Sequence, residues 1–478
     1  TFLTAQLNYF SKNQIWTGTF FDYGFLGNSI GIFSNSLFDG YSIGIQRFFF
    51  KSLVLLNKVL IILICRKVII SIELTSKKEV LFLIFSLSSI TLASFYEDVT
   101  PFHPRIFIYL IFTLLVFNIV TAKNNSYVVS FLAGFFSLLS ILFYWDIGTY
   151  INVLLIIFLL YLFFIKNYGN FYSIILGILS SWIIFFVFTP GSEIKEFFNQ
   201  YFIIINVSDY LIGIEFPKPF SDKSTRHTKA LLLIIFSGVF LINYMFDKLK
   251  NESLESKFLL FFIFISSILF LKSGLTRSDG PHIKYSSGQY TLLIFFFISY
   301  YLIHFINKLK YFYKINYIFE KKKYFIILSI IICFLFIFQN NYFSFLNIFN
   351  SAKNFHAITK IDDKEFLDND YYKFIEIYKD LVKDENCVQQ FTDDNAIPYL
   401  VGTPTCTKYY VNAHIIQNWT EDNFIEELKL FKPNYIVYSS KINWFKNRNN
   451  APNADKFILD NYELFKDLSP WTIYKKIN

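Results

Sequence analysis

The sequence predicts a polytopic α-helical membrane protein that carries a soluble α/β domain in its C-terminal part. Hydrophobic residues make up 54% of the 478 residues, including 63 Phe, and the mean hydropathy is +0.41. A soluble domain collects its apolar residues in one or two cores, whereas here long apolar runs recur along the chain. After residue 338 the runs stop and the chain becomes polar. We therefore expect a transmembrane domain over 1–338 and a separate domain over 339–478.

Ten apolar runs are candidates to cross a hydrocarbon core of roughly 30 Å, which takes about 20 apolar residues. Lys58 interrupts the first run, and the eighth is short. Thr1 is not a natural start, which leaves open whether a further span precedes it. The runs lie near residues 47–65, 79–96, 105–121, 127–145, 149–165, 171–188, 230–246, 258–271, 289–306 and 324–338.

Lysine and arginine concentrate in alternate loops, such as "CRKVIISIELTSKKE" and "NKLKYFYKINYIFEKKK", which is typical of cytoplasmic loops. The other loops, among them "EDVTPFHPR", "WDIG" and "RSDGPH", are richer in carboxylates and are expected to face outward. The net charge of +8 thus belongs to membrane loops rather than to a nucleic-acid surface. The amino-acid composition is typical of a bacterium with an AT-rich genome. Together with the charges of the loops, it predicts a multi-pass protein of the bacterial inner membrane with a periplasmic C-terminal domain.

The C-terminal domain alternates two kinds of pattern. Helical spacing with acidic first turns occurs in two segments, and short β-rich runs occur in four. This alternation predicts a small α/β layer. The helices are expected at 370–384 and 420–431, and the strands at 387–391, 406–411, 434–440 and 471–476.

Two cysteines, Cys387 and Cys406, open two of the predicted strands. A disulfide between them would suit an oxidising periplasm. Two unpaired buried thiols on adjacent strands fit the sequence equally well, so both arrangements stay open.

Ionisable residues gather in the predicted outward loops. A carboxylate there can act as general base on an acceptor hydroxyl, while cations or a carboxylate-held divalent ion stabilise a departing phosphate. Each residue could equally contact lipid headgroups or cap a helix. The candidates for catalysis are Asp22, Glu97 and Asp98, and those for substrate binding are His103, Arg105, Asp146, Arg277, Asp279, His282 and Lys284.

The segment 189–229 follows the sixth predicted span and begins with alternating polar and apolar faces. It is expected to lie in the outward-facing interface of the membrane, or to pack on the helical bundle as a loop helix.

The order of these features resembles the GT-C superfamily of integral membrane glycosyltransferases. The likeness rests on a first outer loop with an aspartate ("FFDYGFLG"), an acidic second outer loop ("EDVTPFHPR"), many spans and a C-terminal periplasmic domain. The bacterial branch of that family includes aminoarabinose and protein O-mannosyl transferases. The resemblance implies an inverting hexosyl or pentosyl transfer from a polyprenyl-phosphate-linked sugar to a lipid, glycan or protein acceptor.

The resemblance also implies roles for three acidic residues. Asp22 corresponds to the first-loop acid, which serves that family as catalytic base or metal ligand, and Glu97 and Asp98 correspond to the acidic pair of the second loop. Because "FDYG" holds one acid rather than a pair, dependence on a divalent cation such as Mg²⁺ or Mn²⁺ stays open, and no metal ligand is assigned.

Two other classes compete with this prediction. An O-antigen polymerase or ligase is also polytopic, but the chain lacks a dominant basic mid-chain outer loop. A polysaccharide or lipid transporter usually carries ionisable residues at membrane depth, where this sequence has almost none beyond Lys58. No phosphate-binding glycine loop, zinc-ligand spacing or serine-nucleophile motif occurs, and no nucleic-acid partner is expected.

Overall fold

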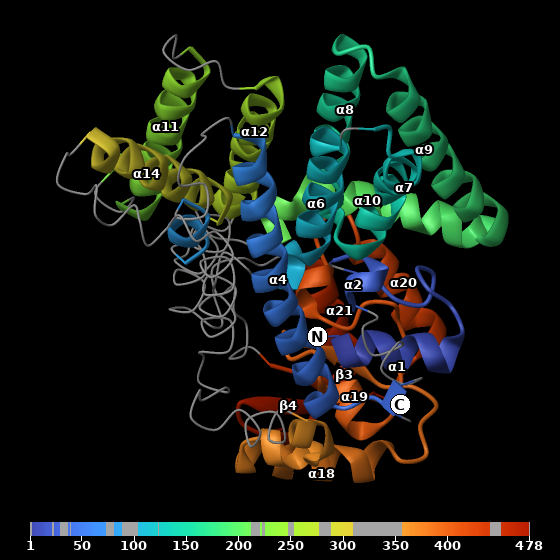
Figure 1. Ribbon diagram of the computed structural model, residues 1–478. Coiled ribbons are helices and arrows are strands. Elements are labelled where there is room, and N and C mark those ends of the chain that lie inside the picture. The colour runs from blue at the N-terminus through green and yellow to red at the C-terminus, as the bar shows by residue number, and fades with distance from the viewer. Residues whose placement is uncertain are drawn as a thin grey trace.

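The computed structural model is mainly helical and has a small sheet near the C-terminal end (Figure 1). It describes residues 2–21, 23–28, 37–38, 40–72, 81–87, 104–122, 124–211, 220–221, 225–246, 253–276, 288–308, 356–439 and 451–477.

The apolar runs within the described residues form helices, as predicted. By length and composition, five helices in the described part of the chain could cross a membrane: Pro104–Thr121, Trp145–Phe164, Tyr168–Phe188, His227–Phe246 and Leu254–Lys272. The predicted span 79–96 is described only over 81–87, where it is helical, and the predicted span 324–338 lies outside the described residues. The helices are α4 (Ile43–Ser71), α6 (Phe107–Thr121), α7 (Tyr127–Phe143), α8 (Trp145–Phe164), α9 (Tyr168–Phe188), α10 (Gly191–Leu211), α11 (Thr225–Phe246), α12 (Leu254–Thr276) and α14 (Gly288–Lys308).

The break between α7 and α8 falls at Tyr144, earlier than the predicted spans place it. Tyr144 has extended backbone angles (φ −150°, ψ 122°), so the chain reverses within one residue. The reversal brings the two helices into backbone contact, since a Cβ on Gly148 would lie 2.5 Å from the Ile141 Cα atom. This early turn places Asp146 in the first turn of α8.

The candidate spanning helices differ in how much of their apolar surface is buried inside the protein, as expected for a helical bundle in lipid. In α6 and α12, 56% of the apolar window is buried, against 22% in α9 and 28% in α11. The exposed residues of α9 and α11 are themselves apolar, for example Leu176, Phe188, Phe236 and Phe246. These two helices therefore present the lipid-facing surface, and α6 and α12 lie inside.

The turn after α8, which contains the basic residue Lys166, points away from the C-terminal domain (Figure 1). At that far end, the hydroxyl of Ser253 donates to the Ser71 carbonyl, joining the end of α4 to the start of α12 (3.0 Å). At the near end, the first turn of α4 meets the C-terminal domain, where Asp363 accepts from the Ile43 N–H (2.8 Å).

The C-terminal part contains a four-stranded sheet with the order β1-β2-β4-β3. Strands β1 and β2 are parallel, and the other pairs are antiparallel. The predicted helices are confirmed as α18 and α20, and three predicted strands as β1, β2 and β4. Strand β3 and helices α19 and α21 were not predicted. The elements are α18 (Asn369–Val382), β1 (Gln389–Phe391), α19 (Ile397–Val401), α20 (Glu421–Phe431), β2 (Tyr435–Tyr438), α21 (Pro452–Asn461), β3 (Tyr462–Leu468) and β4 (Trp471–Lys476), with short 3₁₀ turns η4 (Ile358–Lys360), η5 (Asp363–Phe366) and η6 (Asn412–His414).

The strand expected at 406–411 is wrong, because side chains take the backbone groups that a ladder would use. The Gln389 amide donates to the Tyr409 carbonyl (3.0 Å) and accepts from the Thr407 N–H (3.1 Å). The Gln390 amide donates to the Tyr410 carbonyl. The segment thus runs beside β1 as an irregular chain, and the disulfide between Cys387 and Cys406 fastens its start.

The N-terminal helix α1 (Phe2–Lys12) packs on this C-terminal part rather than on the spanning helices. The Asn8 amide exchanges two hydrogen bonds with Thr405 (2.8 and 2.9 Å), and the Thr4 hydroxyl donates to the Asn395 carbonyl (2.6 Å). The predicted boundary at residue 338 lies outside the described residues and stays a prediction.

Candidate functional site

Two of the predicted substrate-binding residues, Arg105 and Asp146, form an ion pair at the end of the bundle that faces the C-terminal domain. The Arg105 Nη2 atom lies 2.9 Å from both Asp146 carboxylate oxygens. The guanidinium carbon lies 4.4 Å from the centre of the Tyr23 ring and 5.3 Å from that of Tyr144. We call Tyr23, Arg105, Tyr144 and Asp146 the outer cluster.

Local structure explains why these residues meet. Arg105 lies in the 3₁₀ turn η1 (Pro104–Ile106) that leads into α6, and Asp146 occupies the first turn of α8, where the helix dipole favours a carboxylate. Stacking on aromatic rings suits a guanidinium, which is planar and weakly hydrated. The side chains of Arg105 and Asp146 keep only 14% and 31% of their exposure, so solvent screens the pair less than it would a surface pair.

The first outer loop is seated against the turn between α7 and α8. The Trp145 indole N–H donates to the Phe21 carbonyl (3.1 Å), and the Gly24 N–H donates to the Phe143 carbonyl (3.2 Å). A Cβ on Gly24 would lie 2.3 Å from the Leu142 carbonyl oxygen, and one on Gly27 would lie 2.3 Å from that of Phe143. The glycines of the "FFDYGFLG" motif therefore permit a close backbone approach, which continues into the short helix α2 (Phe25–Asn28).

Helix α10 holds the same loop from a second side. The Glu193 carboxylate accepts from the N–H groups of Trp16 (2.7 Å) and Thr17 (3.2 Å) and from the Thr17 hydroxyl. The Gln200 amide accepts from the Phe21 N–H (3.1 Å) and donates to the carbonyls of Trp16 and Thr19 (2.8 and 3.0 Å). In Figure 1, α10 runs across the end of the bundle rather than along α8 and α9. Residues 191–211 are thus a helix packed on the bundle at the end that faces the C-terminal domain.

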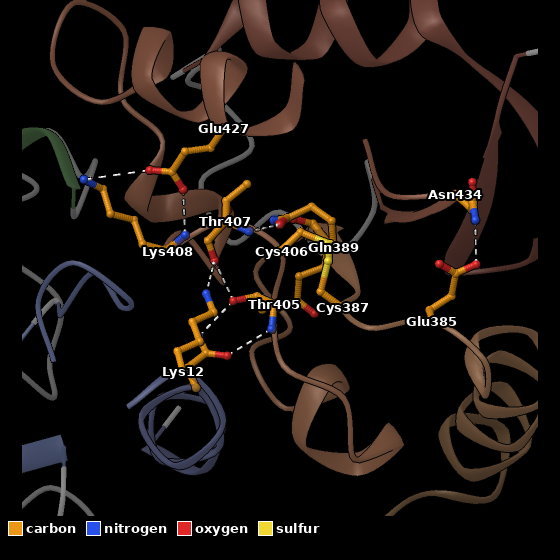
Figure 2. The surroundings of a disulfide bond; sticks show 12 residues. Lys12, Glu385, Cys387, Gln389, Thr405, Cys406, Thr407, Lys408, Glu427 and Asn434 are labelled. Carbon is orange, nitrogen blue, oxygen red and sulfur yellow. Dashed lines mark hydrogen bonds and ion pairs between the residues drawn. A yellow bond between two sulfur atoms is a disulfide. The ribbon is translucent and has the colours of Figure 1, made fainter. Parts of the chain in front are cut away.

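The C-terminal domain holds the loop from a third side through charged residues. Lys408 pairs with Glu196 of α10 (2.8 Å), its N–H donates to Glu427 (2.9 Å), and its carbonyl accepts from the Phe20 N–H (2.9 Å). The Lys12 ammonium donates to the carbonyls of Gly18 and Thr407 (3.1 and 3.2 Å). Figure 2 shows Lys12 and Thr407 close to the disulfide. Burial raises the pKa of Glu427 and lowers that of Lys12 to about 8.

The other predicted site residues lie outside the described residues: Asp22, Glu97, Asp98, His103, Arg277, Asp279, His282 and Lys284. The chain neighbours of Asp22 are described, and both contact the turn between α7 and α8: Phe21 bonds to Trp145, and the Tyr23 and Tyr144 rings meet edge to face at 6.1 Å. The outer cluster thus joins parts of three predicted outward loops.

A divalent cation finds no ligand set in the described part of the chain, where no three His, Cys, Asp or Glu side chains come together. Asp146 already bonds to Arg105 through both oxygens. The predicted acids Asp22, Glu97 and Asp98 are not among these residues, so the predicted divalent cation stays a prediction.

Sequence reasoning missed the residues that hold the first loop. Tyr23 directly follows Asp22, and Tyr144 lies two residues before Asp146. Aromatic residues this close to predicted acids were the available signal. Glu193 and Gln200 lie seven residues apart in an otherwise amphipathic segment, which places them on one helix face. Their partners are 176 to 184 residues away in the chain, and no local pattern reveals such contacts.

No protein-family model matches the sequence, and no curated protein matches it. Among solved structures, the fold is similar to the crystal structure of ArnT from Cupriavidus metallidurans in the apo state, with a TM-score of 0.45 and 9% sequence identity, over 100% of this chain and 92% of that one.

Proposed function

We propose that this protein is a membrane glycosyltransferase that moves a sugar from a polyprenyl-phosphate donor to a cell-envelope acceptor at the end of the bundle that carries the C-terminal domain. The observation that supports this most is the outer cluster. It brings the loop of Asp22 to the Arg105–Asp146 pair, at one end of a bundle of apolar helices. In the proposed function, a lipid-linked donor reaches this end of the bundle from the bilayer, and the acceptor reaches it from water.

The proposed reaction is a single displacement. Asp22 takes the proton from an acceptor hydroxyl, whose oxygen attacks the anomeric carbon of the donor sugar. The bond from that carbon to the phosphate oxygen breaks, and polyprenyl phosphate leaves with the electron pair, so the anomeric configuration inverts. Arg277, His282 and Lys284 are proposed to stabilise the phosphate, with Asp279 orienting Arg277. Glu97, Asp98 and His103 are proposed to line the same side, and no step is routed through a metal.

Within this scheme the Arg105–Asp146 pair supplies polar groups of fixed orientation that contact the sugar. Because Asp146 neutralises Arg105 and two tyrosine rings flank it, the guanidinium has a defined orientation before substrate binds. A preset orientation lowers the ordering cost of contacting sugar hydroxyls.

The test uses the full chain in lipid nanodiscs with undecaprenyl phosphate carrying a hexose, a pentose or an aminosugar. Release of undecaprenyl phosphate is followed by mass spectrometry. We expect release with at least one donor, and a fall of roughly 100-fold or more for Asp22→Asn, which keeps the shape of the side chain and removes the base. Asp380→Asn, at an exposed position of α18, is the matched control and should retain wild-type turnover.

Two outcomes would contradict the proposal. Release of polyprenyl diphosphate from diphosphate-linked oligosaccharides alone would indicate a polymerase or ligase. Movement of labelled lipid across the bilayer without cleavage of any donor would indicate a transporter.

A further inference from the structure

Helix α10 carries two buried polar side chains on the face that meets the first outer loop. Glu193 is 7% exposed and Gln200 is fully buried. Seven residues correspond to about two helical turns, so the two side chains point the same way, one above the other. Between them on the same face, Phe197 packs against the Trp16 and Trp145 rings at 5.0 and 5.3 Å.

These two side chains supply partners for the loop backbone where regular structure does not. Residues 16–21 form neither a strand nor a helix, and the Phe20 and Phe21 side chains are buried. Buried N–H and carbonyl groups without hydrogen-bond partners would destabilise this conformation of the loop. Glu193 and Gln200 bond to the N–H groups of Trp16, Thr17 and Phe21 and to the carbonyls of Trp16 and Thr19.

The held segment ends directly before Asp22. Gln200 and Trp145 bond to the N–H and the carbonyl of Phe21, so both backbone polar groups of this residue are engaged. On the other side of Asp22, the Tyr23 ring stacks on Arg105. The chain is thus fixed on both sides of the proposed base by residues far away in sequence.

We propose that Glu193 and Gln200 are positioning residues that set the orientation of the Asp22 loop for catalysis. The inference rests on the proposed function, in which Asp22 is the base. A displacement of about 1 Å in a catalytic group can cost up to 100-fold in rate, so a loop released by α10 should lower kcat more than it changes donor binding.

The experiment compares substitutions on α10 that remove these contacts with one that keeps them. Glu193→Ala and Gln200→Leu remove the partners of the loop backbone. Glu193→Gln retains one oxygen that can accept from Trp16 and Thr17, and its amide can donate to the Thr17 hydroxyl. Lys195→Ala changes an exposed residue on the same helix and is the control. Thr17→Val removes a single contact and serves if the stronger variants do not fold.

Two readouts are taken on the full chain in nanodiscs: release of undecaprenyl phosphate from the sugar-linked donors, and hydrogen–deuterium exchange of residues 14–24. We expect Glu193→Ala and Gln200→Leu to lower kcat by about 10- to 100-fold, with donor KM within about threefold of wild type and faster exchange of the loop. Glu193→Gln should restore most of kcat. Thr17→Val should give a smaller fall in the same direction.

The outcomes separate the inference from the proposed function. An active wild type with unchanged kcat in folded Glu193→Ala and Gln200→Leu overturns the inference and leaves the function standing. So does a loss of kcat in Glu193→Gln as large as that in Glu193→Ala. An inactive wild type overturns the proposed function and the catalytic role of the two residues with it, while unchanged loop exchange in the variants would show that α10 does not hold the loop.

Discussion

Lys12 shows how a single residue can link the N-terminal helix to the C-terminal domain at an electrostatic cost. Its ammonium donates to two carbonyls, those of Gly18 and Thr407, and Glu427 lies close enough to favour its charge. Burial outweighs this attraction and lowers the pKa from 10.5 to about 8. The folded protein therefore holds the Lys12 proton less tightly than the unfolded chain does.

This lowered pKa predicts a pH-dependent stability. Between pH 8 and 10.5 the unfolded chain binds more protons than the folded one, so the free energy of unfolding rises with pH in that window. Lys12→Met keeps most of the stem and removes the titration. We expect the Tm of the wild type to rise relative to that of Lys12→Met between pH 7 and pH 9, as followed by tryptophan fluorescence in detergent. A Tm difference that stays constant over this range would show that Lys12 keeps an ordinary pKa.

Arg277 carries a prediction that comes from the sequence alone. A bidentate contact with the lipid phosphate needs the planar guanidinium, whereas a residue that reaches to headgroups functions equally well as lysine. We expect Arg277→Lys to lower transfer at least 10-fold, since one of two parallel hydrogen bonds is lost, with normal membrane insertion. Unchanged donor KM and kcat in this variant would assign the loop to the membrane interface instead.

Among the elements, helices α7 and α9 pack through glycine. A Cβ on Gly134 would lie 2.0 Å from the Ile174 carbonyl oxygen, and one on Gly177 would lie 2.1 Å from that of Phe131. Asn170 adds a polar contact by accepting from the Ser130 hydroxyl (3.0 Å). Small residues that let backbones approach are the usual basis of helix packing in lipid.

We expect Gly134→Ala and Gly177→Ala each to destabilise the bundle by about 1–3 kcal/mol, because the obstacle in each case is backbone and the helices must separate. Thermal unfolding in detergent measures the effect. Gly191→Ala, where a Cβ meets nothing within 4 Å, is the control and should leave Tm nearly unchanged. Equal Tm values for all three variants would argue against close packing of α7 on α9.

The disulfide stabilises an element that lacks regular structure. It closes a loop of sequence separation 19 and fastens the segment 405–408, which contacts α1 and the first outer loop. For a loop of this length, removal costs about 3 kcal/mol. We expect a reducing agent to lower the Tm of the wild type but not that of the Cys387→Ala/Cys406→Ala variant, which starts lower. A wild-type Tm that does not change when the disulfide is fully reduced would contradict this expectation.

For the molecule as a whole, the distribution of basic residues among the loops predicts the orientation of the chain in the membrane. The turn after α8, with Lys166, and the C-terminal domain lie at opposite ends (Figure 1). Because basic loops stay in the cytoplasm, we expect the C-terminal domain in the periplasm. A reporter enzyme active only outside the cytoplasm should be active after Asn478 and silent after Lys166. The opposite pattern would invert the topology and remove the proposed site from the side where its donor is expected.

Much of the fold follows from local properties of the chain. The number of apolar residues in a row sets whether a helix can span a bilayer, and the spacing of apolar residues distinguishes helices from strands. For this reason the spans over 105–121, 171–188 and 230–246, the helices α18 and α20, and three of the four strands could be predicted. Arg105 and Asp146 could be selected as candidates because charged residues at the ends of apolar runs are visible in the sequence.

Pairings between distant segments required the three-dimensional structure. Arg105 meets Asp146 across 41 residues, and Glu193 meets Trp16 across 177. The segment 406–411 has the composition of a strand, yet the glutamine side chains of β1 occupy its backbone groups. The sequence leaves open whether Cys387 and Cys406 are bonded. The bond depends on the segment 406–411 lying beside β1 in the folded chain. Composition and spacing describe what each segment can form, whereas the partner that satisfies its buried polar groups depends on which segments the folded chain brings together.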